Sequence, residues 1–117
     1  MELLSGRRPL VLLVNPAARR AARALAVVRA TFAAAGVPYD ELHTERPGHA
    51  GELARAHAGG AAAIVALGGD GTVMEVADAL AYTGCPIGIL PGGTGNLVAR
   101  ALGIPMSAAG AALFAVT

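Results

Sequence analysis

The sequence predicts an α/β protein whose mostly parallel sheet is covered by helices on both faces, giving three layers. Short aliphatic runs alternate with segments whose apolar residues recur at helical spacing. Such alternation is typical of parallel sheets with right-handed crossover connections. The composition agrees, because 55% of the 117 residues are hydrophobic and only 15% are charged, as expected of one well-buried globular domain.

The first half of the chain contains two strand–helix units. A buried aliphatic strand is predicted at residues 10–14, where Asn15 and the following proline end the apolar run. An amphipathic helix follows and stops near Gly36. A second strand, less hydrophobic and so expected nearer the edge of the sheet, is predicted at residues 37–43, and a short helix at 47–58.

The second half repeats the unit. A strand predicted at residues 61–67 runs directly into a glycine turn at 68–72 and then a helix. A fourth strand at 87–90 leads through a second glycine turn at 92–96 into further helical sequence. The chain then ends without an obvious concluding element, which predicts that it is part of a longer protein.

Polar or glycine-rich segments follow all four predicted strands, at Asn15, Thr44, residues 68–72 and residues 92–96. In open α/β sheets the carboxyl ends of parallel strands share one edge, and ligands bind there. Both glycine turns lead into helices, so their backbone N–H groups and the helix dipole favour an anion. Either turn alone could be purely structural, but the two together favour phosphate.

Three side chains in these turns have suitable chemistry. Asp70 can organise a metal ion or the loop itself, while the hydroxyls of Thr72 and Thr94 can donate hydrogen bonds. The three histidines show no recognised metal spacing, so we assign no metal ligand.

Several classes of protein are disfavoured by the residues. All nine basic side chains are arginine, which excludes the mechanisms of P-loop kinases and protein kinases because both require a lysine on the phosphates. Val98 stands where a dinucleotide-binding fingerprint needs its third glycine. A net charge of +1 gives no support to a nucleic-acid partner.

The longest apolar run, residues 61–67, is too short to span a bilayer. A single cysteine agrees with a cytoplasmic protein.

Four motifs occur in order along the chain: Val14-Asn15-Pro16, residues 44–50, residues 68–72 with Glu75, and residues 91–96 followed by 99–105. This set resembles the catalytic domain of diacylglycerol kinases, sphingosine kinases and their bacterial lipid-kinase relatives. The Gly-Gly-Asp-Gly element is shared with NAD kinases, whereas the later Gly-Thr-Gly-Asn element is more specific. The resemblance implies a Rossmann-like fold of the NAD kinase and diacylglycerol kinase type.

The resemblance also implies an ATP-dependent lipid kinase that transfers the γ-phosphoryl group to a lipid hydroxyl, on diacylglycerol or a sphingoid-like lipid, with Mg²⁺. Asp70 would be the catalytic residue. The nucleotide would lie across Asn15, Thr44, Gly68, Gly69, Asp70, Gly71, Thr72, Glu75, Gly93, Thr94, Gly95 and Asn96.

In the family that the chain resembles, a β-rich second domain follows and supplies the lipid pocket. Residues 1–117 are therefore expected to form a single nucleotide-binding domain, the N-terminal part of a two-domain kinase, and to be inactive alone. The residues predict a cytoplasmic protein, and the resemblance implies a lipid alcohol substrate at a membrane surface to which the protein could bind peripherally.

Two alternatives stay open: an NAD-kinase-like phosphotransferase, and a nucleotide-binding or regulatory module without turnover. The chain departs from the family pattern at residues 17–20, at Met74 and at Leu97. The changes at Met74 and Leu97 remove no backbone amide but leave side-chain contacts and the lipid substrate open. The residues at 17–20 leave the first phosphate contact open, or pass it to arginine. The oligomeric state and the role of Asp70, as base or as organiser of metal or phosphate, also stay open.

Overall fold

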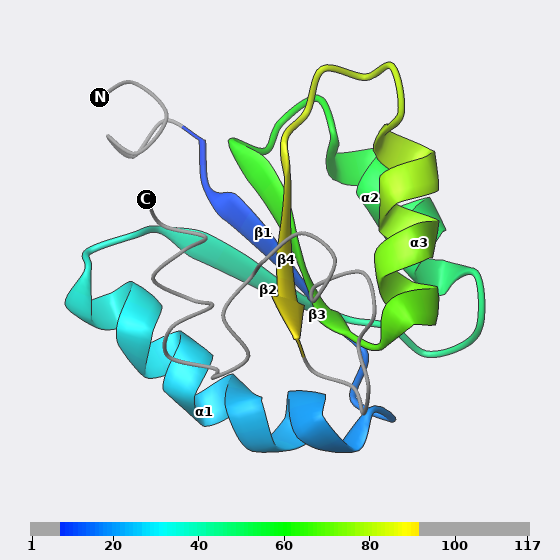
Figure 1. The fold of residues 1–117 in the computed structure, drawn as a ribbon. Helices are drawn as coiled ribbons and strands as arrows, with labels where there is room; N and C mark the ends of the chain where they lie inside the picture. Colours follow the sequence, from blue (N-terminus) through cyan, green and yellow to red (C-terminus); the bar gives the residue numbers. More distant parts are fainter. Residues whose placement is uncertain (1–7, 92–117) are drawn as a thin grey trace.

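A computed structural model describes residues 8–91, which form a four-stranded, fully parallel sheet with three helices (Figure 1). The strands are β1 (Leu10–Val14), β2 (Tyr39–His43), β3 (Ala63–Gly68) and β4 (Ile87–Pro91). The helices are α1 (Arg19–Ala34), α2 (His49–His57) and α3 (Asp70–Leu80). The strand order is β2-β1-β3-β4.

The helices cover both faces of the sheet. Helix α1 lies on one face, and α2 and α3 pack side by side on the other (Figure 1). Right-handed crossovers require this arrangement, because the chain moves from β1 toward one edge and from β2 through β3 to β4 toward the other. The direction reverses between β1 and β3, so the loops after these two strands leave on opposite faces. Their carboxyl ends therefore border the crevice in which such folds bind ligands.

The core lies on both faces of the central strands. All residues of β1 are buried, as are five of the six residues of β3. On one face Phe32 of α1 is fully buried and meets the ring of Tyr39 edge to face, with 5.3 Å between ring centroids. On the other face Val73 and Val76 of α3 are fully buried. Strand β2 lies at the edge, which explains its more polar sequence.

The predicted three-layer α/β fold is confirmed, with shifts of one or two residues at several element boundaries; β3 begins at Ala63 rather than at residue 61, and α2 begins at His49 rather than at residue 47. Strand β2 begins at Tyr39 rather than at residue 37, because the N–H of Val37 donates to the carbonyl of Phe32 at the end of α1 (3.0 Å). The first glycine turn is also shorter than predicted, since Gly68 belongs to β3 and α3 already begins at Asp70. The helix expected after residue 96 lies outside the described residues.

The short turn depends on close packing between β3 and α3. A Cβ atom on Gly68 would lie 2.8 Å from Oγ1 and 2.9 Å from Cβ of Thr72, closer than real Cβ atoms come. Glycine at position 68 therefore allows the first turn of α3 to rest directly on the end of β3. None of the three helices in this part of the chain is long and apolar enough to cross a membrane.

Candidate functional site

A cleft of about 450 Å³ opens at the carboxyl edge of the sheet. Its walls come from the loop after β1, the loop after β2 with the start of α2, and the first turns of α3. The lining residues are Asn15, Pro16, Ala17, Thr44, Glu45, Arg46, Pro47, Ala50, Gly71, Thr72 and Glu75. Because β1 and β3 border the reversal of strand order, the cleft lies where open α/β sheets bind ligands.

Asn15 connects the loop after β1 to the start of α3. Its backbone N–H donates to the carbonyl of Leu67 (3.0 Å). In the side chain, Oδ1 accepts the N–H of Ala17 (3.1 Å), while Nδ2 donates to Oγ1 of Thr72 (3.2 Å). Both ends of the Asn15 amide are thus engaged within the protein, and the side chain holds the Thr72 hydroxyl across the strand reversal.

Thr72 is the polar side chain that the fold buries most completely within residues 8–91, with 7% of its surface exposed. Its oxygen accepts the hydrogen bond from Asn15, so its own proton points elsewhere. This burial follows from the close contact with Gly68. The hydroxyl is therefore fixed in position at the base of the cleft.

The first turn of α3 presents backbone to the cleft. The first bond within this helix joins the N–H of Val73 to the carbonyl of Gly69 (3.1 Å), and the N–H groups of Gly71 and Thr72 precede it. Such N–H groups have no acceptor inside the helix and attract anions. Gly71 is exposed, and a Cβ built on it would meet nothing within 4 Å. A ligand can therefore approach the backbone here.

The loop after β2 forms the opposite wall and is held by hydrogen bonds along its length. The N–H of Thr44 donates to the carbonyl of Val14 (2.9 Å), and the N–H of Glu45 donates to Nδ1 of His49 (2.9 Å). His49 therefore supports the loop from the first residue of α2.

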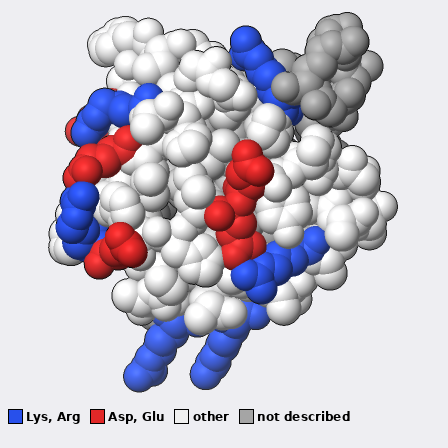
Figure 2. All heavy atoms as spheres, turned by 180° about the vertical axis from the view of Figure 1, so that it is seen from behind, with Lys and Arg blue, Asp and Glu red and all other residues white. Residues whose placement is uncertain are grey.

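The charged lining of the cleft is mixed in sign. Glu45, Arg46 and Glu75 all line it, but Arg46 is paired with Glu52 of α2 through Nη1–Oε2 (2.6 Å) and Nη2–Oε1 (2.9 Å) contacts. The hydrogen bonds from Arg46 lower the pKa of Glu52. In Figure 2, acidic and basic side chains lie beside one another along the left edge and near the middle of a face that is otherwise mostly uncharged. Among the described residues, no three His, Cys, Asp or Glu side chains are grouped to hold a metal ion.

The structure brings five of the residues expected at the site together on the cleft: Asn15, Thr44, Gly71, Thr72 and Glu75. Gly68, Gly69 and Asp70 lie at the junction of β3 and α3 without lining it. Gly93, Thr94, Gly95 and Asn96 lie outside the described residues.

Other cleft residues were absent from the expected site: Pro16, Ala17, Glu45, Arg46, Pro47 and Ala50. Arg46 and its neighbours fall within the motif at residues 44–50, so that motif was the signal that could have identified them. Pro16 and Ala17 follow Asn15 directly and could have been found from that motif in the same way.

The sheet is open and parallel, helices cover both of its faces, and a polar cleft lies at the reversal of strand order. These features define a doubly wound α/β protein with a ligand site at its carboxyl edge. Within that class, residues 9–116 match the family profile of the diacylglycerol kinase catalytic domain. The chain belongs to this family, as its motifs suggested.

Individual relatives agree with the family profile. The chain is 49% identical over 53 residues to a protein named diacylglycerol kinase from Mycobacterium tuberculosis, covering 45% of this chain and 17% of that protein. It is 54% identical over 56 residues to a protein named "Probable lipid kinase YegS-like" from Pseudomonas aeruginosa, covering 46% and 18% of the two chains. A crystal structure of a diacylglycerol kinase from Bacillus anthracis superposes with a TM-score of 0.81 at 35% identity, covering 92% of this chain and 41% of that one. The chain thus spans less than half the length of each of these proteins.

Proposed function

We propose that this chain is the ATP-binding domain of a lipid kinase and that the nucleotide occupies the cleft between Asn15, Thr44 and the first turn of α3. Family membership supports phosphoryl transfer as the reaction class. The observation that carries the site is the exposed backbone of Gly71, which faces this cleft from a helix N-terminus. A chain without lysine must bind phosphate through such groups or through arginine.

The residues of the cleft suggest a division of roles. The N–H groups of Gly71 and Thr72 would donate to phosphate oxygens with help from the helix dipole. Asn15 would orient the Thr72 hydroxyl through one N–H of its amide, and the second N–H of that amide would donate to the nucleotide. Thr44, on the opposite wall, would contact the remainder of the nucleotide.

Magnesium fits these residues only as an ion carried by the nucleotide. Mg²⁺ is commonly held by one or two carboxylates together with substrate phosphates and waters, and the described residues offer no larger cluster of ligands. Asp70, at the start of α3, is the carboxylate that we propose for catalysis, as an organiser of metal-bound water or phosphate or as a base. When bound, the ion would neutralise charge on the phosphates.

The acceptor that we propose is a lipid hydroxyl, on diacylglycerol or a sphingoid-like lipid, presented at a membrane surface. The names of the relatives support a lipid over NAD as acceptor. We further propose that residues 1–117 form the N-terminal domain of a two-domain kinase, because the solved relative extends well beyond the part that this chain covers.

Calorimetric titration with ATP and Mg²⁺ tests the site. Gly71→Val should weaken binding by about tenfold or more, because its Cβ stands where phosphate must approach the backbone. Gly59→Val is the matched control, since a Cβ there also meets nothing within 4 Å and Gly59 does not line the cleft. Equal affinity in the wild type and both variants would show that ATP does not use this turn.

A further inference from the structure

Glu75 joins the two walls of the cleft. It lies on α3, one helical turn after Gly71, and its Oε2 accepts a hydrogen bond from the backbone N–H of Gly48 (3.1 Å). Gly48 ends the loop after β2 and is the N-cap residue of α2. A single side-chain bond therefore connects the helix that carries the glycine turn with the loop that carries Thr44.

The surroundings of Glu75 favour this bond. Helices α2 and α3 are close at this point, where a Cβ on Gly51 would lie 3.4 Å from the carbonyl oxygen of Glu75. The short separation lets the carboxylate reach the N-terminus of α2, where negative charge is favourable. Gly48 has φ of +85°, and it lacks a side chain to cap its own helix.

The loop of residues 44–48 is thus fixed at both ends by different parts of the protein. At its start, Thr44 donates to Val14 of β1 (2.9 Å). At its end, the N–H of Gly48 donates to Glu75 (3.1 Å). The other hydrogen bonds described for this loop join it to β1 and to α2. The bond to Glu75 is therefore the one among them that fixes the loop relative to α3.

We propose that Glu75 is a positioning residue, which sets the distance between the two walls of the cleft by holding Gly48 against α3. The role requires an oxygen that accepts the Gly48 N–H, whereas a contact with Mg²⁺ would require the negative charge. This inference rests on the proposed function only in taking ATP as the ligand.

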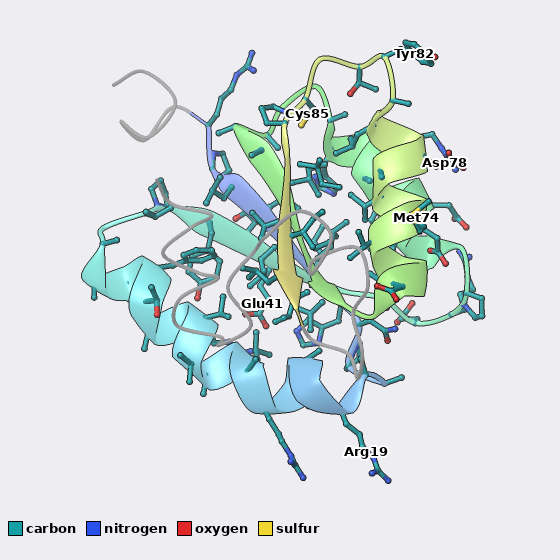
Figure 3. All side chains as sticks on the ribbon, viewed as in Figure 1. Arg19, Glu41, Met74, Asp78, Tyr82 and Cys85 are labelled. Carbon is teal, nitrogen blue, oxygen red and sulfur yellow. The ribbon has the colours of Figure 1, made fainter. Side chains whose placement is uncertain are left out.

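Two substitutions separate these roles. Glu75→Gln keeps an acceptor oxygen and removes the charge, while Glu75→Ala removes both. MgATP affinity should stay within about threefold of wild type in Glu75→Gln and fall by about tenfold in Glu75→Ala. Asp78→Ala is the control, because it removes a carboxylate from the exposed side of the same helix (Figure 3) and should bind as wild type does.

A second measurement needs no nucleotide. Hydrogen exchange of the Gly48 amide, followed by NMR on the folded variants, should be faster than wild type in Glu75→Ala and close to wild type in Glu75→Gln. If wild type fails to bind ATP, the proposed function fails, and this exchange measurement still tests the positioning role.

Two results would overturn the inference. Equal loss of affinity in Glu75→Gln and Glu75→Ala would mean that the carboxylate charge meets the nucleotide or its metal ion. Unchanged exchange of the Gly48 amide in Glu75→Ala would mean that Glu75 does not hold the loop.

Discussion

Several polar side chains around the cleft are engaged by other groups of the protein. The amide of Asn15 is used at both ends, and Arg46 is paired with Glu52. The first turn of α3 is different, because the backbone at Gly71 is open to solvent. At the scale of residues, then, the backbone of this turn is open to an approaching ligand, while the bonded side chains of Asn15 and Arg46 hold neighbouring parts of the protein together.

A second polar group lies away from the cleft, between α1 and the edge strand. Glu41 of β2, labelled in Figure 3, accepts two hydrogen bonds from Arg29 of α1, Nε–Oε1 at 2.7 Å and Nη2–Oε2 at 2.5 Å. It also contacts Nε2 of His43 at 2.7 Å. The hydrogen bonds from Arg29 and, to a smaller extent, from His43 lower the pKa of Glu41 to about 2, although burial raises it. The pair joins α1 to β2 at the sheet edge.

This pKa predicts how stability depends on pH. Because the pKa of Glu41 is about 2 in the folded chain and 4.5 ordinarily, its contribution is complete above pH 4.5 and is lost as the pH falls toward 2. Glu41→Gln should therefore lower the free energy of unfolding at pH 7 and have almost no effect at pH 2. Urea unfolding at a series of pH values measures the difference.

The control is Glu52→Gln, which removes an ion pair whose two side chains are both about half exposed. At pH 7, Glu52→Gln should lower the free energy of unfolding by less than Glu41→Gln does, because exposed ion pairs contribute little to stability. A constant difference between wild type and Glu41→Gln from pH 7 to pH 2 would contradict the proposed linkage.

At the scale of elements, the helices differ in how they begin. Helix α3 carries Asp70 in its first turn, which suits the positive end of the helix dipole. Helix α1 has no acidic residue there and begins with Arg19, which points into solvent (Figure 3). Its N-cap residue, Ala18, has the extended backbone of a cap but no side-chain acceptor. Tertiary packing, rather than capping, therefore stabilises the start of α1.

The missing cap predicts a stabilising substitution. Ala18→Ser supplies an oxygen for the free N–H groups of the first turn and should raise the free energy of unfolding by about 1 kcal/mol. Ala22→Ser, at an exposed position inside the same helix, should instead lower it by about 0.5 kcal/mol. Urea unfolding of the three proteins measures both effects, and a loss of stability in Ala18→Ser would mean that the cap geometry is not used.

At the scale of the whole molecule, the proposed nucleotide site would account for one of the two substrates that a kinase binds. A kinase must bind its acceptor, position or deprotonate the acceptor hydroxyl and exclude water. The cleft described here corresponds to the nucleotide site that we propose. The superposed diacylglycerol kinase continues beyond the 41% of its length that this chain covers, and we expect the acceptor site in such a further part.

We therefore expect residues 1–117 alone not to phosphorylate lipid at a useful rate, even when they bind ATP. A version extended at its C-terminus by the remaining sequence of the solved relative should gain turnover. Transfer of labelled phosphate from ATP to diacylglycerol and to sphingosine in mixed micelles measures this, with Gly71→Val in the extended protein as control. Equal turnover by the short and extended proteins would refute the division into two domains.

Local sequence patterns were sufficient to predict the layers of this fold. Aliphatic runs such as residues 10–14 mark strands buried on both faces, and the more polar β2 was correctly expected near the edge. The parallel arrangement then follows from strand–helix alternation and the handedness of crossovers. Strand burial and strand–helix alternation depend on residues that are close in sequence, so the sequence alone predicts them. The parallel arrangement also predicts the sheet edge on which the polar segments lie.

Contacts between distant residues could not be read in this way. The bonds from Asn15 to Thr72 and from Gly48 to Glu75 join residues 57 and 27 positions apart, and no periodicity relates such pairs. Gly68 and Gly71 show the same limit: both belong to one glycine motif, yet a Cβ at the first would collide with Thr72 and at the second would meet open space. Sequence spacing predicts where backbone turns, whereas the room around each atom depends on how β3 and α3 pack in three dimensions.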